Sequence, residues 1–86
     1  MKKVLLFHFE SCPFCRYARR WIAQVQEENP ALRAVEIEMI DEQLHPALAR
    51  QYDYWFVPTF YVDGNKVHEG VCTKEKVKRI LESAAE

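Results

Sequence analysis

Hydrophobic and polar positions follow different periods along the first half of the chain. Residues 4–9 are almost continuously apolar and β-prone, which predicts a central strand covered by helices on both faces. From Ser11 onward apolar residues recur at spacings of three and four, which predicts a helix that ends at Asn29-Pro30. Residues 35–39 alternate between apolar and acidic, the period of a short strand. Because a helix crosses over between the two strands, they should lie parallel in one right-handed βαβ unit.

The second half of the chain opens with a predicted short helix. Pro46 suits the first turn, and Ala47, Leu48 and Tyr52 give this helix an apolar stripe. It should end before the aromatic segment that leads into Val57-Pro58, because the residue before a proline disfavours helix.

A β-hairpin and a last helix complete the pattern. Residues 59–62 and 66–69 are β-rich and flank Asp63-Gly64-Asn65, a turn signal that predicts an antiparallel hairpin. Thr73 is a suitable N-cap for the last helix. The apolar face of that helix consists of Val77, Ile80, Leu81 and Ala84. The predicted order is β-α-β-α-β-β-α, an α/β fold in a single domain over residues 1–86.

Composition narrows the classes of function. The chain has 86 residues, 49% of them hydrophobic and 29% charged, with a formal net charge of -1. Acids and bases are interleaved, so there is no basic field of the kind that nucleic acid or an anionic membrane requires. No segment approaches the roughly 18 apolar residues of a membrane span, and His8 and Glu10 break the apolar start, which we interpret as a strand rather than a leader. We expect a cytoplasmic protein, and a monomer.

Two of the three cysteines form the motif Cys12-Pro13-Phe14-Cys15 at the start of the first predicted helix. Such a pair can bind a metal, close a structural disulfide or carry out redox chemistry. An odd number of cysteines makes a poor disulfide framework, and this motif in a strand–helix pattern favours redox use in a reducing compartment. Zinc normally takes four ligands, so we expect no metal site. The remaining candidate ligands occur singly along the chain: His8, His45, His68 and Cys72.

The position of Cys12 at the mouth of a helix indicates how its thiol would be activated. Free backbone N–H groups and the positive end of the helix dipole stabilise an anion there, so the thiolate is favoured over the thiol. Pro13 suits the first helical position, and Cys15 lies one turn further in, near enough to close a disulfide with Cys12. Three arginines on this helix would add positive potential, although at least two should belong to its solvated face: Arg16, Arg19 and Arg20.

A second motif, Val57-Pro58-Thr59-Phe60, lies at the entrance to the predicted hairpin. Together with Cys12-Pro13-Phe14-Cys15 it resembles the active-site pattern of the thioredoxin and glutaredoxin superfamily, and the resemblance covers nearly the whole chain. It implies a thioredoxin fold, a four-stranded mixed sheet flanked by three helices. It also implies that Pro58 follows a cis peptide bond beside the nucleophilic cysteine, and that the backbone of Val57 pairs with an incoming peptide or with glutathione.

The chain departs from both branches of this superfamily. Glutaredoxins usually carry a lysine three residues before the first cysteine and a Gly-Gly pair after the hairpin, whereas this chain has Phe9 and Glu69-Gly70 at these places. This departure favours a thioredoxin-reductase-type flavoenzyme over glutathione as the electron donor. Thioredoxins place a buried aspartate six residues before the first cysteine, where this chain has Leu6.

The resemblance implies a thiol-disulfide oxidoreductase that reduces protein disulfides. Cys12 would attack a substrate sulfur and Cys15 would displace the reduced product, so the two thiols carry the electrons and no tightly bound cofactor is needed. Three alternatives stay open. These are a glutathione-dependent glutaredoxin with glutathione as co-substrate, a metal or iron–sulfur carrier that uses Cys12, and a non-catalytic binding module.

Three consecutive aromatic residues, Tyr54, Trp55 and Phe56, precede the proline motif. Adjacent side chains cannot all face the interior of an extended segment, so one or two should be exposed and offer an apolar platform to a protein substrate. Phe14 should lie on the same rim. The expected substrate-binding residues are Pro13, Phe14, Trp55, Phe56, Val57, Pro58 and Gly70.

Cys72 has two interpretations. Free cysteines are usually inert, buried and hydrophobic. In the resembling fold, however, the turn before the last helix lies close to the active site, and a cysteine at a helix start would be activated in the same way as Cys12.

Overall fold

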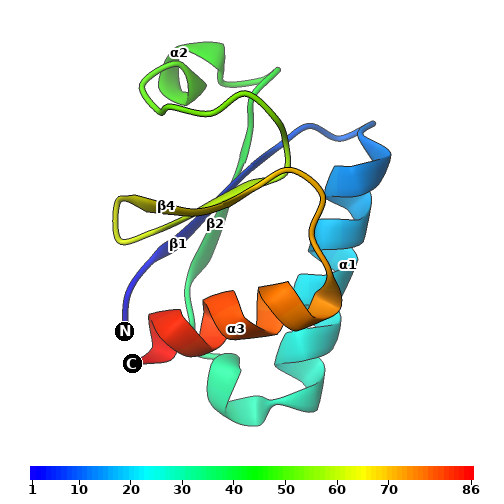
Figure 1. Ribbon diagram of the computed structural model, residues 1–86, viewed down its shortest axis with the longest axis vertical. Helices are drawn as coiled ribbons and strands as arrows, with labels where there is room; N and C mark the ends of the chain where they lie inside the picture. Colours follow the sequence, from blue (N-terminus) through cyan, green and yellow to red (C-terminus); the bar gives the residue numbers. More distant parts are fainter.

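The computed structural model describes all 86 residues and has the element order that the sequence predicts, with one added 3-10 turn (Figure 1). The elements are β1 (Val4–His8), α1 (Pro13–Glu28), the 3-10 turn η1 (Pro30–Leu32), β2 (Ile37–Asp41), α2 (Pro46–Ala49), β3 (Thr59–Val62), β4 (Asn65–Glu69) and α3 (Lys74–Ala85). None of the helices combines the length and the apolar character that crossing a membrane requires.

The four strands form one mixed sheet in the order β2-β1-β3-β4. Strand β1 is central, as predicted; it runs parallel to β2 and antiparallel to β3. Phe7 near the end of β1 lies opposite Thr59 at the start of β3. The segment that follows β1 and the segment that precedes β3 therefore lie at the same end of the strands. These two segments carry the two motifs found in the sequence.

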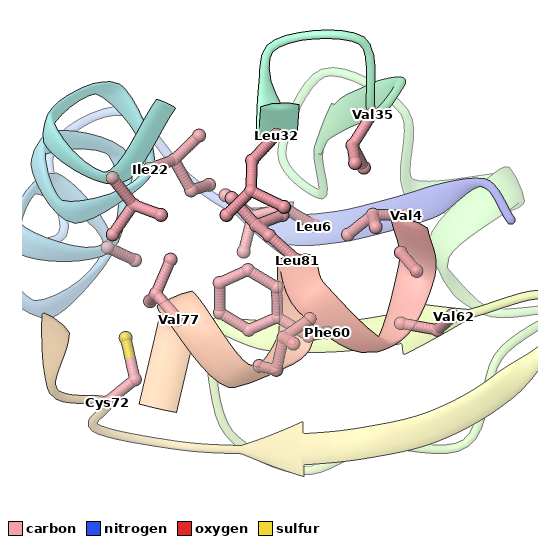
Figure 2. Close-up of a cluster of buried hydrophobic side chains, with 14 residues drawn as sticks. Val4, Leu6, Ile22, Leu32, Val35, Phe60, Val62, Cys72, Val77 and Leu81 are labelled. Atoms are coloured by element: carbon pink, nitrogen blue, oxygen red, sulfur yellow. The ribbon is translucent and has the colours of Figure 1, made fainter. Parts of the chain in front are cut away.

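One face of the sheet is covered by α1 and α3. Fourteen buried residues form the core there, contributed by β1, β3, both long helices and the turns between elements (Figure 2). Its largest members are Phe60, Leu6 and Leu81, all completely buried. Burying a side chain of this size contributes about 1.5–3 kcal/mol, so this cluster is the main source of the fold's stability.

The other face of the sheet differs from the expectation that helices cover both sides. Helix α2 has only four residues, and the predicted apolar stripe is wrong: Ala49 is its buried residue, whereas Leu48 is exposed. Tyr52 lies beyond the helix and packs on Phe7, with ring centroids 4.7 Å apart. Tyr61 completes this aromatic cluster, its ring 5.1 Å from that of Tyr52. Aromatic rings therefore cover most of this face, because they fill space that one helical turn leaves open.

The hairpin turn and the start of α3 both follow local sequence signals. In the hairpin turn Asp63 and Gly64 adopt positive φ angles of 52° and 85°, conformations that asparagine, aspartate and glycine tolerate best. Thr73 caps α3 as predicted, because its hydroxyl oxygen accepts the N–H of Lys76 at 3.1 Å.

The two edge strands of the sheet carry charged side chains. On the β2 edge, Glu38 forms an ion pair with Lys3, Nζ to Oε1 2.8 Å. On the β4 edge, Lys66 pairs with Glu69 at the same distance. The pairing of β4 with β3 also shifts register opposite Phe60 and Tyr61, so the β4 edge is irregular as well as charged.

Candidate active site

Cys12 is the N-cap residue of α1. Its own N–H donates to the carbonyl oxygen of Phe9 at 3.2 Å, which closes the turn that leads out of β1. Its backbone is extended (φ -75°, ψ 120°), and its sulfur accepts the N–H of Cys15 at 3.4 Å. Pro13 occupies the first helical position, where no N–H is needed. The local sequence therefore places a sulfur at the end of the helix where unpaired N–H groups point outward.

Cys15 lies one turn further along α1, on the face that packs against the sheet. It is completely buried, whereas Cys12 retains 6% exposure, so Cys12 carries the outer sulfur and Cys15 the inner one. Burial, and then the neighbouring Cys12 sulfur, raise the pKa of Cys15 to about 12. Both cysteines are free thiols in this structure. At neutral pH the inner cysteine is thus a protonated thiol held beside the outer sulfur.

Arg19 is the one arginine of α1 that the structure fixes beneath this site. Its Nη1 donates to Nδ1 of His8 at 3.0 Å, and its Nη2 donates to the carbonyl oxygen of Glu10 at 3.3 Å. Because a guanidinium only donates, the Nδ1 of His8 is the acceptor. Burial, and then the charge of Arg19, lower the pKa of His8. Arg16 and Arg20 lie on the exposed face of the helix, as expected for two of the three arginines.

The loop before β3 contains the second motif. The Val57–Pro58 peptide bond is cis. The N–H of Gly70 donates to the carbonyl oxygen of Pro58 at 2.8 Å, which ties the loop to the segment after β4, and Gly70 itself has a φ of 91° that favours glycine. The N–H and carbonyl groups of Val57 have no partner within the chain. The backbone of Val57 is therefore free to form hydrogen bonds, and it lies at the end of the strands where Cys12 also lies.

The three consecutive aromatic residues divide as the sequence predicts. Tyr54 faces inward; its ring lies 5.0 Å from that of Phe7, and its hydroxyl donates to Glu42 at 2.7 Å. Burial, and then this hydrogen bond, raise the pKa of Tyr54. Trp55 and Phe56 are 85% and 70% exposed, and Phe14 between the cysteines is 52% exposed. We call these last three side chains the aromatic rim: Phe14, Trp55 and Phe56. That the rim binds substrate is still a prediction.

Cys72 is a core residue, so of its two interpretations the structure supports the buried, inert one. It is 7% exposed and belongs to the cluster under α1 and α3, where Figure 2 shows its side chain among Val77 and Phe60. Burial raises the pKa of Cys72 to about 11. The reason is positional: Thr73, not Cys72, is the N-cap of α3.

One residue near the site was not assigned a role from the sequence. The carboxylate of Glu69 accepts the backbone N–H groups of Trp55 and Phe56, 14 and 13 residues away. No local pattern could have indicated this contact. No group of three or more histidine, cysteine, aspartate or glutamate side chains is arranged to hold a metal ion.

The amino-acid sequence of this chain is similar to those of thioredoxins. The family model of the thioredoxin domain matches residues 2–82. Thioredoxin from Methanocaldococcus jannaschii is 37% identical over 73 residues, which are 85% of this chain and 84% of that protein.

Solved structures show the same fold. Oxidised thioredoxin from Plasmodium falciparum superposes with a TM-score of 0.75 at 16% identity, covering 99% of this chain and 82% of its own. A mutant thioredoxin from Halobacterium salinarum superposes with a TM-score of 0.72 at 25% identity, covering 99% of this chain and 75% of its own.

Proposed function

Because the chain belongs to the thioredoxin domain family, whose members are thiol-disulfide oxidoreductases, we propose that it reduces protein disulfides through Cys12 and Cys15. One observation carries the proposal. An outer sulfur caps a helix N-terminus, which stabilises a thiolate, and an inner cysteine beside it is kept protonated by burial. This is the division of labour that a two-step exchange requires.

In the first step the Cys12 thiolate attacks one sulfur of the substrate disulfide. A Cys12–substrate disulfide forms, the substrate S–S bond breaks, and the leaving sulfur takes the proton of Cys15, directly or through solvent. In the second step Cys15, now deprotonated, attacks the Cys12 sulfur and releases the second substrate thiolate. The products are two substrate thiols and a Cys12–Cys15 disulfide, so two electrons have passed to the substrate.

The geometry around Cys15 bears on the second step. Cys15 must lose its proton to attack, and this chain has Leu6 where thioredoxins carry a buried aspartate. The guanidinium of Arg19 lies one turn along the same helix and opposes the effect of burial on the pKa of Cys15.

In this proposal the loop around Pro58 binds the substrate. The unpaired backbone of Val57 can hydrogen-bond an extended segment of a protein substrate, and the aromatic rim supplies apolar contact beside it. Pro13, next to Cys12, and Gly70, whose N–H binds the carbonyl oxygen of Pro58, are the further residues that we propose contact the substrate. We further propose that the protein acts in the cytoplasm as a monomer without a tightly bound cofactor, and that a thioredoxin-reductase-type flavoenzyme, rather than glutathione, returns the Cys12–Cys15 disulfide to the dithiol.

A trapping experiment tests the mechanism. The Cys15→Ser variant cannot complete the second step and should accumulate protein partners joined to Cys12 by a disulfide, released by dithiothreitol and identified by mass spectrometry. The matched control is Cys12→Ser/Cys15→Ser, which should trap nothing. Equal capture by both variants would show that Cys12 is not the nucleophile.

A second assay separates the reductants. The oxidised wild type is mixed either with NADPH and a thioredoxin reductase or with glutathione, glutathione reductase and NADPH. Faster recovery of thiols in the first mixture is expected, and faster recovery in the second would assign the protein a glutaredoxin-type cycle.

A further inference from the structure

Glu69 is the last residue of β4, and its carboxylate is used entirely for holding other groups in place. Oε2 accepts the backbone N–H of Trp55 at 2.5 Å and that of Phe56 at 2.9 Å. Oε1 accepts from Lys66 Nζ at 2.8 Å. The carboxylate of Glu69 on β4 thus binds the backbone N–H groups of Trp55 and Phe56, the two consecutive residues of the aromatic rim.

Other hydrogen bonds restrain the same loop. The hydroxyl of Thr59 donates to the carbonyl oxygen of Phe56 at 2.5 Å, and the hydroxyl of Tyr61 donates to that of Asp53 at 2.6 Å. The backbone from residue 53 to residue 58 is therefore fixed at both ends and in the middle, and Glu69 supplies the bonds in the middle.

Two side chains on this fixed backbone, those of Trp55 and Phe56, are not used for packing. Trp55 and Phe56 are the two most exposed aromatic side chains of the chain, at 85% and 70%. Burying either ring in the core would stabilise the fold, so a loop shaped by stability alone would turn them inward. A rigid backbone that presents unpacked rings is instead typical of a preorganised binding surface, which lowers the entropy lost when a partner binds.

We propose that Glu69 is a positioning residue that sets the orientation of Trp55 and Phe56 and thereby makes the site selective for disulfides within protein chains over small disulfides. The inference rests on the proposed disulfide reductase function. A protein substrate is long enough to contact Cys12 and the rim together, whereas a small disulfide needs only the sulfur of Cys12. Loosening the loop should therefore penalise the protein substrate alone, and chiefly through KM.

The restraint is present at every physiological pH. The ammonium group of Lys66, and then the two N–H donors of Trp55 and Phe56, lower the pKa of Glu69 to about 2. Glu69 is thus a permanent carboxylate, and the selectivity it confers should not depend on pH between 5 and 8.

The test measures kcat/KM of wild type and Glu69→Ala for reduction of insulin and of hydroxyethyl disulfide, with dithiothreitol as electron donor. We expect the ratio of the two constants to fall about 5- to 10-fold in Glu69→Ala, through a higher KM for insulin with kcat retained. Lys66→Met is the matched control, because it removes the ion pair and leaves both backbone contacts of the carboxylate. It should keep a ratio within about twofold of wild type.

A structural readout accompanies the kinetics. Amide hydrogen exchange at Trp55 and Phe56 should be at least about tenfold faster in Glu69→Ala and intermediate in Glu69→Gln, which keeps an acceptor but loses the charge. If Glu69→Ala does not fold, Glu69→Gln serves for both measurements.

The outcomes separate the two proposals. If the wild type reduces neither disulfide, the proposed function fails. If the wild type is active and Glu69→Ala changes both substrates equally, or changes neither, the function stands and the role of Glu69 is overturned. An unchanged exchange rate at Trp55 and Phe56 would overturn it as well.

Discussion

Two helices begin beside a cysteine, and the two cysteines are placed in opposite ways. At the start of α1 the cysteine is itself the cap, and the Cys12 sulfur accepts the N–H of Cys15. At the start of α3 the cap is Thr73, and Cys72 stands one residue earlier with its side chain in the core (Figure 2). A shift of one residue decides whether a sulfur meets the free N–H groups of a helix or a set of apolar side chains.

The difference teaches that closeness to a helix N-terminus does not by itself activate a thiol. The favourable field is local to the first turn and acts on a group that lies on the helix axis in front of the N–H groups. For Cys72 the desolvation cost dominates, and burial raises its pKa to about 11. The following predictions test this contrast, from the largest expected effect to the smallest.

Removing each sulfur in turn should give the largest contrast. Cys12→Ser should lower the rate of insulin reduction by a thousandfold or more, on the order seen when a covalent nucleophile is removed. Cys72→Ala should keep the rate within about twofold of wild type, since Cys72 touches no part of the proposed site. A turnover assay at saturating dithiothreitol measures both, and retained activity in Cys12→Ser would refute the assigned mechanism.

Moving a cysteine onto the cap of α3 should create a reactive thiol. In a chain with Cys12→Ser and Cys15→Ser, the added pair Cys72→Ala and Thr73→Cys leaves one thiol, now at the N-cap. Alkylation by iodoacetamide at pH 7.5 should be on the order of a hundredfold faster than that of Cys72 in the same background, because the thiolate gains N–H donors and loses the burial penalty. Equal rates would show that the cap position is not what distinguishes Cys12 from Cys72.

A polar atom at the position of Cys72 should destabilise the core. Cys72→Ser places a hydroxyl in the cluster of Val77 and Phe60 and should cost about 1–3 kcal/mol of unfolding free energy. Urea denaturation measures the change, with Cys72→Ala as the reference for lost volume. A serine variant as stable as the alanine variant would mean that the site is wetter than its burial indicates.

Alkaline pH should weaken the fold through the same cysteine. The pKa of Cys72 is raised from an ordinary 9.0 to about 11 in the folded chain, so the folded state holds this proton more tightly than the unfolded state does. The contribution of this proton to the free energy of unfolding is complete below pH 9 and is lost as the pH rises toward 11. The wild type should lose roughly 2 kcal/mol more than Cys72→Ala across this window in urea titrations. Parallel pH profiles for the two chains would contradict the assignment.

Sequence reasoning succeeded where the cause is local. Pro13 and Thr73 act within one helical turn, and the left-handed angles at Asp63 and Gly64 require only the residues of the turn itself. The helix starts, the hairpin turn and the place of Cys12 at the start of α1 could therefore be predicted.

The failures concern contacts between segments that are far apart in the chain. Tyr52 lies beyond the end of α2 and its ring packs on Phe7 of β1, so a helical period could not describe it. For Cys72 the sequence left two interpretations open, because its place in the core depends on contacts with residues of other elements. Glu69 binds N–H groups on another segment, and nothing in its neighbours distinguishes it from an ordinary surface acid.

The charged edges of the sheet affect whether copies of the protein associate at high concentration. Exposed strand edges tend to pair with edges of other copies, and such pairing is the usual beginning of fibrous aggregation. Here an incoming strand would meet Glu38 with its ion-paired Lys3 at the β2 edge, and Lys66, Glu69 and a break in register along β4. Aligning two copies would bring like charges together and leave hydrogen bonds unmade. The small sheet can therefore remain dispersed at high concentration with both of its edges uncovered.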